Sequence, residues 1–272
     1  MLPENIFLHE KCFRTKQLTQ LQLESTSKGN QRKWYNHKEG IYVKEQFRYQ
    51  NKMWKDYLVE VLSYEIWQQF KHDKNVNVLR QQKCKIVDYD CTSMGVYSSN
   101  FCEQNEYFVS FKRLLELNGK SFPVSGTISE KWDFTLDTMN YITSLDLVDY
   151  LITMSILDYL VGNEDRHLNN FGVITTGKNF KLAPLFDFGL GLFGHDRKYE
   201  GEPLRRCIEM MQCQPFSKNN QEVIDFLGKR YDLEKYLPGT LDFTYSEIPT
   251  PKAGSYIRNR CMKLCITVKG LD

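Results

Sequence analysis

The clearest helical patterns lie in the carboxyl-terminal half of the chain. In segment 146–161 apolar residues occur on every side, which predicts a fully buried helix. Gly162 follows directly, and glycine at this position commonly ends a helix. Segment 53–70 instead repeats its apolar residues every three or four positions, as an amphipathic helix does. Further helical patterns cover 221–230 and 255–268.

Strand-like patterns dominate the first part of the chain. One segment in the second half, 172–182, reads as strand, turn and strand. Segment 112–144 has a mixed pattern, punctuated by Gly, Ser and Thr, to which we assign no function. Four short segments before it predict strands, of which the last two would help to close a small sheet: 20–27, 40–45, 84–89 and 106–111.

Composition and charge narrow the class of protein. The chain has 272 residues, 41% of them hydrophobic, which allows a substantial core in one two-lobed domain or two small ones. Lys and Arg number 36 against 34 Asp and Glu, so the formal net charge of +2 gives no global attraction for nucleic acid or anionic membranes. No long apolar run and no signal-like amino terminus is present, so we expect no membrane span and a cytoplasmic location.

The eight cysteines are scattered without a Cys-x2-Cys pair, so they predict neither a zinc site nor a disulfide framework. Cys261 and Cys265 lie one turn apart in the predicted helix 255–268. Two small core residues are a simpler interpretation of that spacing than two metal ligands. We therefore expect reduced thiols.

The densest candidate chemistry lies in segment 158–191. Asp165 precedes Asn170 with the Asp-x4-Asn spacing by which kinase catalytic loops hold a base and a magnesium ligand on one turn. An Asp-Phe-Gly triplet begins at Asp187, after the predicted hairpin. In phosphoryl transfer Asp165 would accept the proton of the substrate hydroxyl or orient that hydroxyl. Asn170 and Asp187 would hold Mg²⁺, a hard cation that prefers oxygen ligands.

This block resembles a known family. The stretch GNEDRHLNNF at 162–171, followed by LAPLFD at 182–187, resembles the signature of HipA-like serine/threonine kinases, roughly G-N-x-D-x-H-x-x-N-F and then L-A-P-x-[YF]-D. The Asp-Arg-His-x-x-Asn portion with a later Asp-Phe-Gly is also similar to phosphoinositide kinases, so this portion alone leaves protein and lipid substrates open. The resemblance implies ATP and Mg²⁺ as ligands. It makes His167 a catalytic-loop residue that chiefly orders the loop, with a proton shuttle as the alternative.

The resemblance continues into a candidate phosphate loop. Successive backbone N–H groups of a tight turn, with a lysine nearby, form an anion site. The leading hydroxyl residue of this loop is autophosphorylated in several family members. The resemblance therefore implies autophosphorylation here, at Thr26 with Ser27 or Ser25 as alternatives, which would switch the kinase off. The residues that match the family's S/T-x-x-G-x-Q-x-K pattern are Thr26, Gly29, Gln31 and Lys33.

Three further nucleotide contacts are implied by similarity to kinases. Lys44 ends an Ile-Tyr-Val-Lys stretch similar to the kinase Val-Ala-Ile-Lys strand, and is the candidate for the α- and β-phosphates. The helix at 53–70 would supply the carboxylate that pairs with this lysine. Glu60 matches the family's pattern best, and Glu65 is the alternative. The backbone near Val109 would meet the adenine.

These features predict an α+β, two-lobed protein-kinase-like fold, with a β-rich lobe at 1–110 and a helical lobe at 111–272. The leading function is a serine/threonine protein kinase that acts on a protein hydroxyl. The alternatives are a phosphoinositide or other small-molecule kinase and a non-catalytic nucleotide-binding module. We expect no direct nucleic-acid binding. The resemblance also raises a toxin role, with a small antitoxin or accessory protein as partner.

Overall fold

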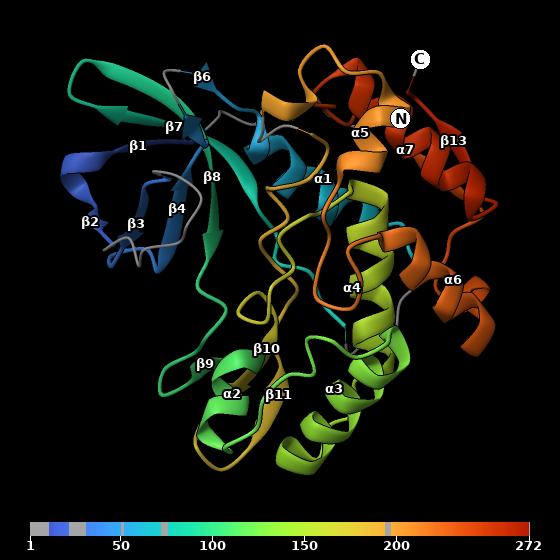
Figure 1. The fold of residues 1–272 in the computed structure, drawn as a ribbon. Helices are drawn as coiled ribbons and strands as arrows, with labels where there is room; N and C mark the ends of the chain where they lie inside the picture. Colours follow the sequence, from blue (N-terminus) through green and yellow to red (C-terminus); the bar gives the residue numbers. More distant parts are fainter. Residues whose placement is uncertain (1–10, 22–30, 50–51, 72–75, 194–196, 272) are drawn as a thin grey trace, which may run out of the picture.

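The computed structural model describes residues 11–21, 31–49, 52–71, 76–193 and 197–271. The chain forms two lobes, one built on a sheet and the other mainly helical (Figure 1). This is the α+β, two-lobed arrangement that the sequence predicts.

The amino-terminal lobe is organised by a six-stranded sheet in the order β1-β7-β8-β4-β3-β2. β1 pairs with β7 in parallel, and the other neighbours are antiparallel. One face of the sheet covers a small apolar core that includes Trp34, Val43 and Ile86. A short hairpin of β5 (Arg48–Tyr49) and β6 (Lys52–Met53) follows β4. The six strands are β1 (Lys11–Arg14), β2 (Thr19–Gln20), β3 (Lys33–Asn36), β4 (Ile41–Glu45), β7 (Gln82–Asp88) and β8 (Cys91–Ser99).

Helix α1 (Asp56–Trp67) packs on both lobes and confirms the helix predicted at 53–70. Leu58 packs with Val96 of the sheet, whereas Leu62 and Ile66 belong to the core of the helical lobe. Burial of each such side chain stabilises the fold by about 1.5–3 kcal/mol. The helix is therefore held from two sides.

The second lobe is built around α4 (Val148–Val161), whose side chains are all buried from Tyr150 onward. Its uniform burial is what the apolar pattern predicts. Gly162 then ends the helix with φ of 58°, in the left-handed region that favours glycine. The other helices after α1 are α2 (Phe111–Leu117), α3 (Ile128–Thr143), α5 (Leu204–Met210), α6 (Asn220–Arg230) and α7 (Pro251–Lys263).

Helix α3 fills about half of the segment whose pattern was mixed, and α2 occupies its first residues. It begins with a capping box, in which the Thr127 side chain accepts a hydrogen bond from the Glu130 backbone and the Glu130 carboxylate accepts one from the Thr127 backbone. Trp132 and Met139 bury its inner face. The Thr-x-x-Glu pattern of the capping box was present in the sequence. The helix that follows was not predicted, because its many polar residues obscured the helical repeat of its apolar residues.

The lobe boundary lies earlier in the chain than residue 110. β9 (Tyr107–Ser110) pairs with β10 (Gly172–Thr175), and β10 pairs with β11 (Phe180–Leu182) in the predicted hairpin. β9 therefore belongs to the sheet of the helical lobe, and the chain crosses between β8 and β9. An alternating pattern predicts a strand but does not say which sheet it joins.

The carboxyl-terminal end departs from its predicted helix. α7 stops at Lys263, and β13 (Thr267–Lys269) pairs with β12 (Thr240–Asp242). Cys261 is buried in α7 while Cys265 is exposed beyond it, so the two thiols do not form a site. All eight cysteines are free. No helix within the described ranges is long and apolar enough to cross a membrane.

Candidate active site

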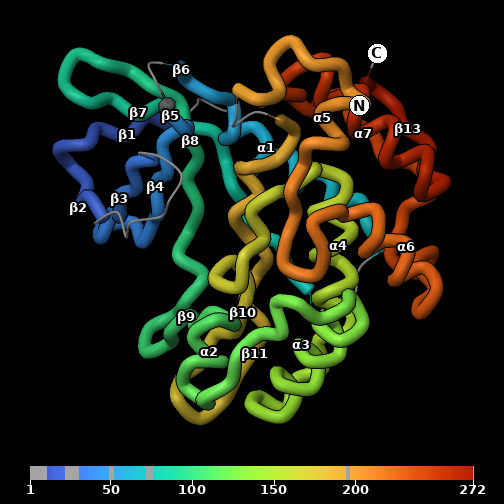
Figure 2. The backbone as a smooth tube through the Cα atoms, in the orientation of Figure 1, coloured from blue at the N-terminus to red at the C-terminus, as the bar shows by residue number. Residues whose placement is uncertain are grey.

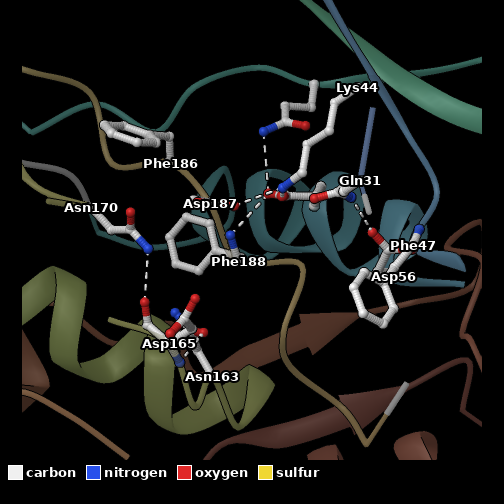
Figure 3. Close-up of polar contacts among 12 residues, drawn as sticks. Gln31, Lys44, Phe47, Asp56, Asn163, Asp165, Asn170, Phe186, Asp187 and Phe188 are labelled. Carbon is white, nitrogen blue, oxygen red and sulfur yellow. Dashed lines mark hydrogen bonds and ion pairs between the residues drawn. The ribbon is translucent and has the colours of Figure 1, made fainter. Parts of the chain in front are cut away.

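A lysine of β4, a glutamate of α1 and an aspartate that follows β11 meet between the lobes (Figure 3). Lys44 Nζ lies 2.6 Å from Glu60 Oε1 and 2.6 Å from Asp187 Oδ1. Glu60 Oε2 accepts hydrogen bonds from the Phe188 backbone at 2.9 Å and from Gln81 Nε2 at 3.2 Å. Glu60 is thus oriented by three donors and is the partner of Lys44.

The alternative carboxylate, Glu65, lies five residues further along α1 and hydrogen-bonds Ser246 instead. Only one of the two glutamates reaches Lys44, because a helix turns by about 100° per residue and five residues separate them. The choice between them follows from the position of α1 against β4.

The charges around Lys44 stabilise one another. Burial by itself lowers the pKa of Lys44, but the carboxylates of Asp187 and Glu60 outweigh burial and raise it. Burial likewise raises the pKa of Asp187, but the cations Lys44, Lys33 and Arg166 outweigh it and hold that pKa below its ordinary value. The lysine is therefore cationic and Asp187 anionic at neutral pH, the states needed to bind phosphates and a divalent cation.

The candidate catalytic loop is closed by its own amide side chains. Asn163 Nδ2 donates to Asp158 Oδ1 at 2.8 Å, and Asn163 Oδ1 accepts from the Asp165 backbone at 3.1 Å. At the other end of the loop, Asn170 Nδ2 donates to the Asp165 carbonyl at 2.7 Å. The Asp165 side chain stays 22% exposed. The loop is rigid, and its aspartate remains accessible to a substrate.

Arg166 joins this loop to the loop that carries Asp187. Its side chain is fully buried, and Nε and Nη2 each lie 2.9 Å from a carboxylate oxygen of Asp158. Nη1 donates to the carbonyls of Asn170 at 2.9 Å and Phe186 at 2.6 Å. The guanidinium also lies 4.5 Å from the ring centroid of Phe188. This one buried cation thereby fixes the positions of the two candidate metal ligands, Asn170 and Asp187, relative to each other.

Two oxygen atoms at this junction suit a hard cation. Within the described part of the chain, Asn170 Oδ1 and Asp187 Oδ2 accept no hydrogen bond, while the other polar atom of each side chain is engaged. No cluster of three or more His, Cys, Asp or Glu side chains that could bind a metal occurs there. Mg²⁺ is usually held by one or two protein oxygens together with water and substrate phosphates. The donor set therefore fits Mg²⁺.

His167 is part of the loop structure. Its Nε2 lies 3.8 Å from Asp165 Oδ2, which is too long for a hydrogen bond. Its Nδ1 accepts a hydrogen bond from the Asn169 backbone at 3.3 Å, and its own backbone N–H donates to the Asp165 carbonyl at 2.8 Å. These contacts agree with an ordering role.

The Asp-Phe-Gly triplet adopts an unusual backbone conformation. Asp187 has φ of 62°, the left-handed region that costs a non-glycine residue on the order of 1–3 kcal/mol. At Gly189 a Cβ atom would come within 3.0 Å of Glu60 Oε1. The glycine therefore allows α1 and this loop to approach closely.

A cavity of about 260 Å³ lies beside Lys44 and Asp187. Lys33 stands with these two charged residues in its wall. The rest of its lining is largely apolar, with Val43, Leu79, Val96, Phe101 and Phe186 among its members. A largely apolar pocket with charges on part of its wall suits a heteroaromatic base that carries phosphates.

Val109 does not line this cavity. Its strand β9 pairs with β10, so its backbone is engaged within the helical lobe. Ser98 and Phe101, at the crossing between the lobes, line the cavity instead. The adenine contact near Val109 stays a prediction, although the strand at 106–111 joins the sheet of the helical lobe and not the first sheet.

The four phosphate-loop candidates separate into distinct positions. Lys33 lies in the cavity wall, opposite Lys44 in the pairing of β3 with β4. Gln31 is not among the lining residues, and its side chain hydrogen-bonds Asp56 of α1. Thr26 and Gly29, with the expected autophosphorylation site, lie outside the described residues.

Asp56 is a site residue that the sequence analysis missed. Gln31 Nε2 donates to its Oδ2 at 2.8 Å, and the Phe47 backbone donates to its Oδ1 at 2.7 Å. The side chain is almost fully buried, and burial raises the pKa of Asp56 to about 7. The available signal was its position one turn before Glu60 on the same predicted helix.

Gln214 is the second missed residue. Its Nε2 lies 3.4 Å from Asp165 Oδ1 and 3.4 Å from the Glu164 carbonyl. It comes from the segment between α5 and α6, far along the chain from the catalytic loop. No local pattern marks it, because the contact forms only in the folded lobe.

Comparisons with known proteins support this description of the fold. No family model matches the chain, and no curated protein matches it in sequence. Among solved structures the chain is similar to the proinflammatory kinase CtkA of Helicobacter pylori, with a TM-score of 0.54 and 17% identical residues. The alignment covers 92% of this chain and 83% of that chain. The likeness establishes a kinase-like fold.

Proposed function

We propose that this chain is an ATP-dependent kinase that transfers the γ-phosphoryl group to a serine or threonine hydroxyl of a protein. The observation that carries the proposal is the buried guanidinium of Arg166. It holds the Asp165 loop against the Asp187 loop, next to the Lys44–Glu60 ion pair. This combination supports catalysis better than simple binding, because nucleotide binding alone does not require Asp165.

The nucleotide would enter the cavity with its base among the apolar residues, near Ser98 and Phe101. Lys44 and Lys33 would then meet the phosphates. Asn170 and Asp187 would hold Mg²⁺, which when bound neutralises charge on the phosphates.

Asp165 has the geometry of a group that orients the acceptor. It is partly exposed, and its backbone is fixed by Asn163 and Asn170. In the proposed reaction the acceptor oxygen bonds to the γ-phosphorus while the bond from that phosphorus to its bridging oxygen breaks. The hydroxyl proton passes to the Asp165 carboxylate, and ADP leaves.

The proposal is tested with Asp165→Asn. We expect phosphoryl transfer to fall by about 10²- to 10⁴-fold, the usual contribution of general-base assistance, while ATP affinity stays unchanged. Asp137→Asn, an exposed site on α3, is the matched control. Turnover is followed with labelled ATP, and binding by calorimetry. Wild-type turnover in Asp165→Asn would refute the assigned role.

The same assay separates the alternatives when a generic protein substrate and phosphoinositide vesicles are offered in parallel. Label in protein, as serine or threonine phosphate, supports the proposal. Label confined to lipid would identify a lipid kinase instead. ATP binding without transfer to either acceptor would favour a nucleotide-binding module.

A further inference from the structure

A second hollow, of about 920 Å³, lies in the helical lobe beside the candidate catalytic loop. Its walls come from α2, the connection from α2 to α3, Lys131 of α3, the loop residues 167–169 and the segment 212–218. Figure 2 shows this connection, in green, passing below the orange segment that precedes α6. We call this hollow the basic groove.

Positive charge is concentrated in the basic groove. Among the described lining residues Glu116 is the one carboxylate, and it pairs with Arg113 at 3.2 Å. Lys131 Nζ donates to the backbone carbonyl of Phe216 at 3.3 Å. Across the described ranges no carboxylate forms an ion pair with any of its four lysines, which are Lys112, Lys120, Lys131 and Lys218. The formal net charge of the chain is only +2, so this concentration of positive charge is local to the groove.

The groove reaches the proposed catalytic aspartate. His167 and Asn169 of the catalytic loop form part of its wall. Gln214 also lines it, and Gln214 Nε2 lies 3.4 Å from Asp165 Oδ1. A chain lying in the groove would therefore bring a neighbouring hydroxyl to Asp165.

We propose that the basic groove binds an acidic segment of the protein substrate, next to the serine or threonine that is phosphorylated. This inference rests on the proposed function and adds the substrate class. Carboxylates of the substrate would pair with the lysines, because no carboxylate in the described part of the chain forms an ion pair with these cations. Lys112 of α2 and Lys218 of the segment 212–218 are both exposed, so both can reach a bound chain.

A peptide fits this surface better than a nucleic acid does. Apolar side chains stand between the lysines, and Val124 is 79% exposed. Phe122 is the only phenylalanine, tyrosine or tryptophan among the described lining residues, and no arginine lines the groove. Single-stranded nucleic acids are usually bound by several stacking rings and by arginine. A peptide that carries both apolar and carboxylate side chains therefore matches the lining of the groove better.

The test compares three serine peptides that differ only in their flanking residues, which are Asp and Glu, Asn and Gln, or Lys. We expect kcat/KM to be highest for the acidic peptide, about ten-fold above the neutral one if several carboxylates pair at roughly two- to five-fold each. The preference should shrink at 1 M salt, where the Debye length is about 3 Å.

The variant Lys112→Glu/Lys218→Glu should bring the acidic-to-neutral ratio of kcat/KM to one or below. Lys178→Glu/Lys235→Glu makes the same change in total charge at exposed sites outside the groove, and should keep the ratio. Binding of a fluorescent acidic peptide is measured alongside, since it does not depend on phosphoryl transfer.

The outcomes separate the two proposals. Phosphorylation without acidic preference, or a preference that survives reversal of Lys112 and Lys218, overturns the groove assignment and leaves the kinase intact. Lysine-dependent binding of the acidic peptide without any phosphorylation supports the groove and overturns the kinase. Displacement of the bound peptide by single-stranded nucleic acid at lower concentration than by an unlabelled acidic peptide also overturns the groove assignment.

Discussion

At the scale of single residues, Arg166 and Asp158 form a fully desolvated pair on which both loops of the site depend. Replacing Arg166 with Met would leave the Asp158 carboxylate buried with Asn163 as its main partner. Loss of one member of a buried pair costs about 3–5 kcal/mol of unfolding free energy. We therefore expect Arg166→Met to be strongly destabilised in urea denaturation.

The control for this variant is Arg205→Met. Arg205 also pairs with a carboxylate, Glu209 at 3.2 Å, but its side chain is 92% exposed. We expect no measurable change in its denaturation midpoint. Equal stability of the two variants would show that Arg166 does not hold the loops together.

Asp56 predicts a pH dependence. Its pKa of about 7 in the folded protein exceeds the value of about 3.9 for an unfolded chain. The folded state therefore binds more protons between these values, so this group's contribution is complete below about pH 4 and is lost as pH rises to about 7. We expect unfolding free energies measured from pH 4 to 8 to fall less steeply in Asp56→Asn than in the wild type. Parallel profiles would contradict the assignment.

At the scale of elements, the exit of α4 determines where the catalytic loop begins. At Gly162 a Cβ atom would lie 2.8 Å from Met211 Cε and 3.0 Å from the Tyr256 ring, in a backbone conformation with φ of 58°. Gly162→Ala should therefore combine a left-handed penalty of about 1–2 kcal/mol with a steric clash. We expect lower thermal stability and slower phosphoryl transfer.

Gly177 provides the comparison, because it has φ of 88° but open space around its Cβ position. Gly177→Ala should show only the conformational penalty and retain full activity. If the two alanine variants lose equal stability, the packing of Met211 and Tyr256 around Gly162 does not contribute to the loss.

The elements also show which local signals were informative. α4 was predicted because its apolar residues occur on every side, and the β10–β11 hairpin because its residues carry the turn. β9 was recognised as a strand but assigned to the wrong sheet, since both sheets accept the same alternating pattern. The first turn of α3 has a capping box, yet the many polar residues of this helix hid it.

At the scale of the whole molecule, the proposed nucleotide cavity is lined by residues of both lobes, so a nucleotide bound there should stabilise the fold by linkage. Mg-ATP at one hundred times its Kd should add about 2.7 kcal/mol of unfolding free energy. Asp187→Ala should lose the Mg²⁺-dependent part of this gain, because it removes one of two candidate metal ligands. Thermal denaturation with and without Mg²⁺ measures the effect, with Asp137→Ala as control. A Mg²⁺-dependent shift that persists in Asp187→Ala would contradict the metal assignment.

The sequence by itself determined the buried helix, its glycine end, and the spacing of Asp165, Asn170 and Asp187. These features are local, because they depend on helical period, turn chemistry and positions within one stretch of chain. Only the tertiary structure decided that Glu60 rather than Glu65 meets Lys44, and that Val109 stays outside the cavity.

The tertiary structure also brought Gln214 to Asp165, and Arg166 to the Asp187 loop. Each of these contacts joins elements whose relative positions follow from burial of the shared core and from sheet pairing. A pattern within one segment carries no information about such positions, because the same amphipathic stretch can pack in many places.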